Sequence, residues 1–200
     1  MGKLMGRRER KKIESKKSIM HAAVRNFTEN GVTETSIADI MKEAGLGVGT
    51  FYNYFESKDA LLFCLLQEIA ETVCGQAVKS MDDGEPAEVI LREAVRNTTE
   101  ALSANPYVLP LFLGTGRKIP NVREQLNEKP VRSPGFKSVF TDIIKYGQEH
   151  GEFDKTLDPE LVTEMFHSIF QAASFSSLPY TFGDNVARKV GFILKGIEPR

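Results

Sequence analysis

The side chains with the clearest binding chemistry lie together in one short stretch, residues 49–55. Thr50 and Tyr52 offer hydroxyl groups, and Asn53, the next residue, offers a carboxamide. Hydroxyl groups bind phosphate oxygens, and a carboxamide can pair with two atoms of an adenine edge, a contact worth about 1–3 kcal/mol of discrimination between bases. This combination indicates recognition of double-stranded DNA.

No catalytic or metal-binding motif accompanies this stretch. The sequence has no G-x-S-x-G, no phosphate-binding loop and no H-E-x-x-H motif. His150 and His167 are lone histidines, for which surface or core roles are commoner than metal ligation. We therefore expect no enzyme activity, no cofactor and no metal. An all-α enzyme or an interaction protein is kept as the alternative.

Two short helices are predicted to position the binding side chains. Thr35 and Ser36 can cap the first helix, with Asp39 as the partner of Ser36 in a capping box. Gly45 can end it, because a residue without Cβ tolerates the positive φ of a C-terminal turn. The inward side of this helix repeats at helical spacing: Ile37, Ile40, Met41 and Ala44.

The second helix is expected to begin three residues after this glycine. Phe51 and Phe55, one turn apart, would face inward and leave Tyr52 and Asn53 exposed. Two short helices joined by a Gly-containing turn form a helix-turn-helix, whose second helix enters the DNA major groove. The same pattern also fits a plain helical hairpin in an all-α domain.

These residues resemble the N-terminal signature of the TetR family of transcriptional regulators. The resemblance extends without a gap over roughly residues 13 to 62. It implies an all-α homodimer with a three-helix helix-turn-helix headpiece and a C-terminal helical body that binds a ligand and dimerises. The matching positions are Thr35, Ser36, Asp39, Ile40, Ala44-Gly45-Leu46, Gly49 to Phe55, Ser57-Lys58 and Leu61.

The resemblance also implies which residues contact DNA. Tyr52 and Tyr54 match positions that touch phosphates, and Lys58 follows them at the start of the next helix, whereas Thr50 and Asn53 are candidates for base contacts. Tyrosines in a short helix can equally belong to the edge of a core. The predicted DNA-binding residues are Thr35, Ser36, Gly47, Val48, Gly49, Thr50, Tyr52, Asn53, Tyr54 and Lys58.

Gly47 and Val48 depart from the commonest pattern of the family. Many members have Ser or Thr at the position of Gly47, and often a polar or basic residue at that of Val48. The hydroxyl contact is therefore lost, although glycine is an acceptable N-cap. Val48 would instead make an apolar contact, for which the methyl group of thymine is a suitable partner.

Charge is distributed unevenly along the chain. The net charge is −1 over 200 residues, but residues 1–17 contain eight basic and two acidic residues. A basic end suits DNA phosphates, with an affinity that falls as salt rises, and a solvated, disordered tail is also consistent with it. We predict a basic flexible arm over residues 1–12, a helix-turn-helix domain over residues 13–60 and a body over residues 61–200.

The helix predicted over residues 57–79 joins the headpiece to the body. A ligand that displaces its far end would change the spacing between the two recognition helices of a dimer. Residues 117–135 allow at most a helix over 121–128, because prolines flank that segment. Further helices are predicted over residues 13–30, 87–104, 136–150, 159–177 and 184–196.

The body contains apolar residues that could line a hydrophobic effector pocket, although ordinary core is the commoner role for such a set. The resemblance implies that the last two helices pair with their symmetry mates as a four-helix bundle. The pocket candidates are Phe112, Phe140, Met165, Phe166 and Phe170.

The predicted function is that of a ligand-responsive regulator, a repressor that a small hydrophobic effector releases from a palindromic operator. A regulator that needs no small molecule is a further alternative. Cys64 and Cys74 lie about 15 Å apart on one predicted helix, so they suit the free thiols of a cytoplasmic protein. The apolar runs are too short for a transmembrane helix, and we expect no membrane contact.

Overall fold

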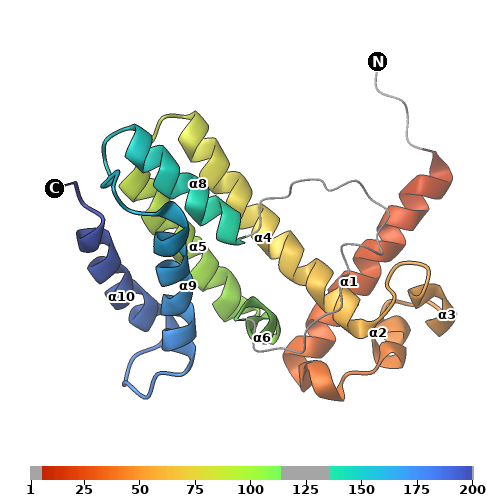
Figure 1. Cartoon of the computed structure of the whole chain (residues 1–200). Coiled ribbons are helices and arrows are strands. Elements are labelled where there is room, and N and C mark those ends of the chain that lie inside the picture. Colours follow the sequence, from red (N-terminus) through yellow and green to blue (C-terminus); the bar gives the residue numbers. More distant parts are fainter. Residues whose placement is uncertain (1–5, 114–135, 200) are drawn as a thin grey trace. The chain divides into compact units, whose positions relative to one another are not determined.

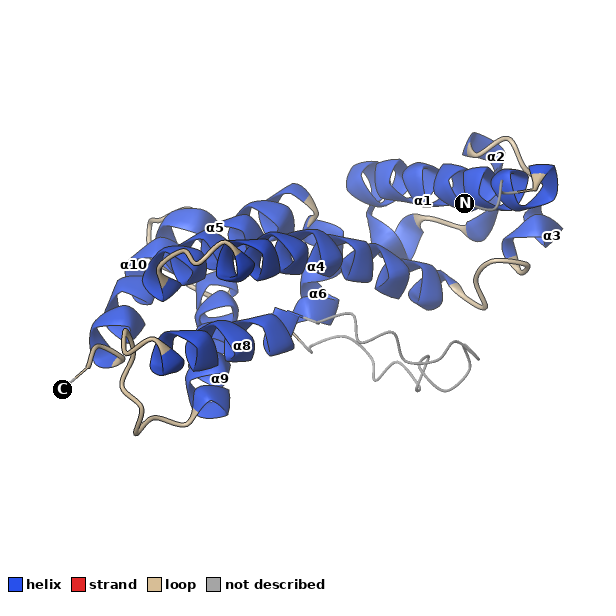
Figure 2. Cartoon of the chain, turned by 90° about the horizontal axis from the view of Figure 1, so that it is seen from above, coloured by secondary structure: helices blue, strands red, loops and turns tan. Residues whose placement is uncertain are grey.

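The computed structural model describes residues 6–113 and 136–199, and every regular element in these two ranges is a helix (Figures 1 and 2). The predicted all-α class is therefore confirmed. The prediction for residues 121–128 lies outside the described residues. The elements are α1 (Arg7–Glu34), α2 (Ile37–Glu43), α3 (Val48–Phe51), α4 (Lys58–Asp82), α5 (Ala87–Ala104), the 3-10 turn η1 (Pro106–Val108), α6 (Leu109–Phe112), α8 (Phe136–Glu149), α9 (Pro159–Ser174) and α10 (Phe182–Gly196).

The chain divides into two compact units. The first, called the headpiece here, contains the chain up to Leu65 and also Pro106–Val108, and the second, the body, contains Leu66–Asn105 and the residues from Leu109 onward. One unbroken helix, α4, passes from the headpiece into the body at Leu65. No linker therefore marks the boundary, which the sequence analysis placed after residue 60.

The headpiece is built on α1, which is longer than the sequence predicted. It begins at Arg7 instead of near Ile13, because Arg, Lys and Glu are strong helix formers even where they pack on nothing. The expected stop at Gly31 is a kink, with φ of 79°, and one further turn of helix follows it. The buried face of α1 consists of Ile19, Met20, Ala22, Ala23, Asn26 and Phe27.

Within the body, α5 packs against α8 and α10, and α9 contacts both α8 and α10 (Figure 1). Gly147 allows α8 to approach its neighbours closely. A Cβ atom at that position would lie 2.2 Å from the ring of Phe153 and 2.8 Å from the Cβ of Ala87. Any larger residue would force these elements apart.

Two helix starts in the body are capped by side chains, and the cap of α10 places its start at Phe182, before the predicted residue 184. The Asp158 carboxylate accepts a hydrogen bond from the backbone N–H of Glu160 at 2.9 Å, and Pro159 occupies the first turn of α9. Thr181 caps α10 in the same way, accepting from the N–H of Asp184 at 3.1 Å. These bonds satisfy amides that a helix start leaves unpaired.

Among the described residues, α4 is long and apolar enough to cross a membrane by length and composition alone. The expectation that the uninterrupted apolar runs are too short for a transmembrane helix uses a different criterion and stays a prediction. Core helices of soluble proteins pass the same test. The side chains of Leu61, Leu65 and Val73 are buried inside the protein.

Candidate nucleic-acid interface

The start of α2 is held by a reciprocal pair of hydrogen bonds. The Ser36 hydroxyl accepts from the N–H of Asp39 at 3.1 Å, and the N–H of Ser36 donates to the Asp39 carboxylate at 3.0 Å. The predicted capping box is therefore confirmed. The hydrogen bonds from the Ser36 side chain and backbone lower the pKa of Asp39 below its ordinary value, since they stabilise the charged form.

Thr35 is buried, unlike its exposed neighbour Ser36. Its hydroxyl lies 2.7 Å from the carbonyl oxygen of Gly31 and 3.2 Å from that of Asn26, so it donates to the end of α1. The structure thus places one of the predicted DNA-binding hydroxyls inside the headpiece, where it fixes the turn from α1 to α2.

Lys58, the first residue of α4, is directed back at the end of α1. Its ammonium group donates to the carbonyl oxygens of Val32 at 2.5 Å and Thr35 at 2.7 Å, with that of Thr33 at 3.4 Å. Carbonyl groups at a helix C-terminus carry partial negative charge and attract a cation. In this geometry Lys58 joins α4 to α1, and a phosphate contact would require it to leave these partners.

The angle between α1 and α2 is held by the carboxylate of Glu43. It accepts hydrogen bonds from the Arg25 guanidinium and from the Asn26 amide, and it forms an ion pair with the former. Asn26 is buried, and its amide also donates to the carbonyl of Ala22 at 2.9 Å. The sequence does not reveal this clamp, because Glu43 is 17 and 18 residues from its two partners and they share no periodic pattern.

The recognition helix α3 is shorter than predicted. It covers four residues, and the chain continues from Tyr52 to Tyr54 as turns with 3-10-type bonds, such as Tyr54 N–H to Phe51 O at 2.9 Å. Gly47 occupies the N-cap with no side-chain hydrogen bond, as expected for a residue without a hydroxyl. Phe51 and Phe55 are buried, with ring centroids 5.6 Å apart. These two rings form the buried side of α3 and of the turn that follows it.

The opposite side of α3 and its following turn is exposed. Val48 is 46% exposed and Tyr52 60% exposed, and Asn53 is exposed as well. Thr50 and Tyr54 are half-buried. We call the side chains of residues 47–54 that face solvent the α3 surface. An exposed valine and tyrosine beside a free carboxamide offer apolar, hydroxyl and amide contacts to one partner.

The headpiece also carries a basic segment, residues 7–17 of α1. It contains seven basic and two acidic residues, and all nine of these side chains are exposed. Residues 7–12 were expected to form part of a flexible arm, and the structure shows them as helix. Residues 1–5 of that arm lie outside the described residues. The local excess of positive charge attracts polyanions.

Comparison with known proteins assigns this headpiece. Residues 19–64 match the family model of bacterial regulatory proteins of the tetR family. The headpiece of this chain is therefore similar to the corresponding part of those regulators. The matched residues contain the buried face of α1, the capped α2, all of α3 and the first turns of α4.

Known proteins resemble this chain in sequence, and solved structures share its fold over most of its length. The fatty acid metabolism regulator protein of Bacillus subtilis is 26% identical over 74% of this chain and 75% of its own. FadR from Bacillus subtilis, solved in complex with stearoyl-CoA, has a TM-score of 0.68 at 20% identity, covering 91% of this chain and 99% of that one. The FadR repressor of Thermus thermophilus, solved with lauroyl-CoA, has a TM-score of 0.64 at 21% identity, covering 92% and 96%.

The pocket candidates in the body fall into two groups. Phe140 stacks on Phe166 with ring centroids 5.9 Å apart, and Phe112 meets Phe170 edge to face at 5.3 Å. All four rings are buried, and we call them the aromatic cluster. Met165 instead lies on another side of α9 and is 48% exposed.

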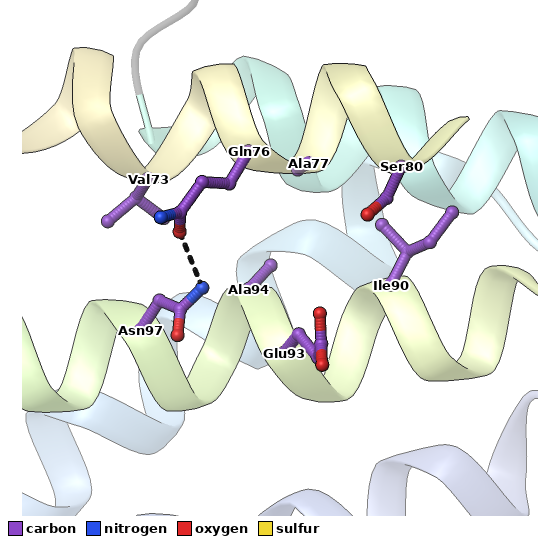
Figure 3. Close-up of a pocket in the computed structure, with 8 residues that line it drawn as sticks. All are labelled: Val73, Gln76, Ala77, Ser80, Ile90, Glu93, Ala94 and Asn97. Atoms are coloured by element: carbon purple, nitrogen blue, oxygen red, sulfur yellow. Dashed lines mark hydrogen bonds between the residues drawn. The ribbon is translucent and has the colours of Figure 1, made fainter. Parts of the chain in front are cut away.

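Two hollows in the described part of the body differ in character. One, of about 10 Å³, lies between α4 and α5 and has room for about one water molecule (Figure 3). There the amide of Asn97 donates to Gln76 at 2.8 Å across the two helices. The other, of about 290 Å³, is open to solvent beside Lys145 and Lys155. Neither encloses the volume of a long acyl chain.

His167 lies against the aromatic cluster, a contact that the sequence does not predict. Its ring centroid is 5.0 Å from that of Phe112. Burial, and then the nearby positive charge of Lys137, lower the pKa of His167, so the neutral imidazole is favoured. Among the described residues no group of three or more His, Cys, Asp or Glu could hold a metal ion.

Several large apolar side chains of α9, of α10 and of the turn between them are exposed. Phe192 is 77% exposed and Phe175 71% exposed, values unusual for phenylalanine in a folded chain. We call this set the α9–α10 surface. It consists of Leu161, Met165, Phe175, Leu178, Tyr180 and Phe192.

Proposed function

We propose that this protein is a transcriptional repressor that binds a palindromic operator as a homodimer and leaves it when a hydrophobic effector binds the body. The observation that carries the proposal is the α3 surface. Two buried phenylalanines hold α3 from behind, so that Val48, Tyr52 and Asn53 project together. This is the arrangement that a helix-turn-helix needs in order to reach base edges. Such a protein acts on cytoplasmic DNA and needs no catalytic group.

The basic segment supports the same function by a different force. Its lysines and arginines would neutralise phosphates beside the bases that α3 reads, and each phosphate so neutralised makes the affinity fall more steeply with salt. Because phosphate contacts carry no sequence information, this segment would add affinity without selecting the site.

The effector in this proposal is a long-chain acyl-CoA thioester. Two structural relatives were solved with stearoyl-CoA and lauroyl-CoA, and the curated relative is named for fatty acid metabolism. The aromatic cluster of the body supports an apolar ligand, because buried rings provide the environment that an acyl chain prefers. Space for such a ligand would require these rings to separate.

A homodimer through the last two helices is supported by the α9–α10 surface. Its phenylalanines and leucines would lose unfavourable contact with water on meeting a second copy. Gly191, next to the most exposed phenylalanine, has no atom within 4 Å of the position of its missing Cβ. A bare position of this kind lets two helices approach closely.

The experiment that tests the proposal begins with selection from random duplexes by the full-length protein. We expect enrichment of a palindromic sequence whose affinity falls steeply between 50 and about 200 mM salt. Lauroyl-CoA or stearoyl-CoA should then release the duplex, whereas free CoA should not. Enrichment without release by acyl-CoA would favour a regulator with another effector or none, and failure to enrich any sequence would contradict the DNA-binding function.

A further inference from the structure

One edge of the aromatic cluster is formed by a polar side chain, His167 of α9. Its ring centroid lies 5.0 Å from that of Phe112, which in turn meets Phe170 edge to face. The imidazole is half-buried, whereas the rings of the cluster are buried. A group that can form hydrogen bonds is thus in direct contact with the apolar side chains that an acyl chain would displace.

The ring nitrogens of His167 have no hydrogen-bond partner among the described residues. In that part of the chain every inaccessible side-chain nitrogen or oxygen has a partner, so these unpaired nitrogens can be reached by a small molecule. Polar groups beside apolar surface are normally hydrogen-bonded, because a bond left unmade costs free energy. The folded chain itself therefore does not use the hydrogen-bonding capacity of this imidazole.

The charged groups that act on His167 are Lys137 of α8 and Glu164 of α9. Their ammonium and carboxylate groups lie 3.0 Å apart, and both side chains are 63% exposed, so this edge of the cluster faces water. Burial, and then the charge of Lys137, lower the pKa of His167, while Glu164 acts in the opposite direction. At neutral pH the imidazole is therefore uncharged and offers one N–H donor.

An acyl thioester matches this combination of apolar rings, a neutral donor and water. Its hydrocarbon chain is stabilised among apolar side chains, and its charged CoA portion is most stable in water. Its carbonyl oxygen lies between these two parts and is a neutral hydrogen-bond acceptor. A carboxylate would instead form its strongest hydrogen bond with a cationic donor.

We propose that the imidazole of His167 donates a hydrogen bond to the carbonyl oxygen of the acyl effector and thereby selects acyl groups over other apolar chains. The inference rests on the effector class proposed above and adds the polar contact that positions the acyl group. The chain would enter among the separated rings of the aromatic cluster, and the CoA portion would leave past Lys137 and Glu164. A histidine that only fills space would not distinguish a ligand with a carbonyl oxygen from one without it.

The test compares lauroyl-CoA with S-dodecyl-CoA, a thioether of the same chain length that lacks the carbonyl oxygen. The full-length variants His167→Leu and His167→Phe both remove the donor, and the second keeps a ring against Phe112. His150→Leu is the matched control, since His150 also lies against an aromatic ring, that of Tyr146, at 4.2 Å between centroids. Affinities are measured by isothermal titration calorimetry at neutral pH, and thermal unfolding is followed in parallel.

We expect the wild-type protein and His150→Leu to bind lauroyl-CoA about three- to tenfold more tightly than the thioether, the effect of one neutral hydrogen bond. Both His167 variants should bind the two ligands with equal affinity. An equal loss of affinity for both ligands, with the preference intact, would overturn the inference, because it would indicate a packing role. So would a wild-type protein that shows no preference. A wild-type protein that binds neither ligand would overturn the proposed effector class instead.

Discussion

Side chains that bind the ends of helices hold the headpiece together at the scale of single residues. Ser36 and Asp39 satisfy the start of α2, Thr35 donates to the end of α1, and Lys58 donates to the same end from α4. The sequence predicted the capping box, because both members lie within one turn. It could not predict the partners of Lys58, since these are backbone groups more than 20 residues away.

Replacement of Lys58 by methionine separates its two roles. If the ammonium group mainly holds the end of α1, Lys58→Met should lower the free energy of unfolding by about 1.5–3 kcal/mol, the usual contribution of charged hydrogen bonds. The dependence of log affinity on log salt should keep its slope. Chemical denaturation and salt titrations of operator binding measure the two effects. A slope smaller by about 0.9 with unchanged stability would instead indicate one lost phosphate contact.

The capping box should give the headpiece a dependence on pH. Hydrogen bonds from Ser36 lower the pKa of Asp39 in the folded state, so their stabilising effect is present above the unfolded pKa and is lost as pH falls through the lower folded value. Ser36→Ala should therefore lower the melting temperature by about 2–4 °C at neutral pH. Calorimetry across the acid range should show the two proteins converging, and a constant difference at all pH values would contradict this explanation.

Helices with local signals were predicted closely, and those that depend on distant contacts were not. The starts of α2 and α9 follow from their caps and were predicted to within two residues, because caps act within one turn. The turn η1 has no such signal. It was assigned to the body, yet Pro106–Val108 belongs to the headpiece, where Tyr107 packs against Phe27 with ring centroids 5.8 Å apart.

Removal of the Tyr107 ring should weaken the headpiece. The side chain is buried, and burial raises its pKa to about 12, so the phenol stays neutral. Tyr107→Ala should cost about 3–5 kcal/mol through the cavity it leaves beside Phe27. Hydrogen exchange should quicken in α1 and α2. An exposed tyrosine supplies the control, since Tyr180→Ala should leave these amides unchanged. Equal exchange in both variants would contradict a structural role for η1 in the headpiece.

For the whole molecule, the sequence predicted a helical headpiece and a helical body, and the structure agrees. It predicted less well what the body contains. Apolar spacing assigned Met165 to the same pocket as Phe166, although neighbouring residues on a helix face different sides. The spacing of apolar residues distinguishes the buried face of a helix from the exposed face only where a single face is apolar. Because α9 has two apolar faces, the spacing could not show which residues are buried.

The α9–α10 surface leads to a prediction about assembly. Phe192→Glu places a charge where the proposed dimer would bury a ring, and a buried unpaired charge is strongly unfavourable. We expect the variant to be a monomer that keeps its helical content and loses affinity for the palindromic operator, because one headpiece reads only half a site. Analytical ultracentrifugation and circular dichroism measure both properties. A dimeric variant would show that another surface joins the two copies.

The unbroken passage of α4 from headpiece to body has a consequence for recombination between related genes. A recombination point in a flexible linker tolerates extra or missing residues. A recombination point inside α4 must instead keep the number of residues in the helix unchanged. Each inserted residue turns everything beyond it by about 100° and advances it by about 1.5 Å. Successful chimaeras of this protein should therefore be joined without any change in the length of α4, and natural exchanges should have left that length untouched.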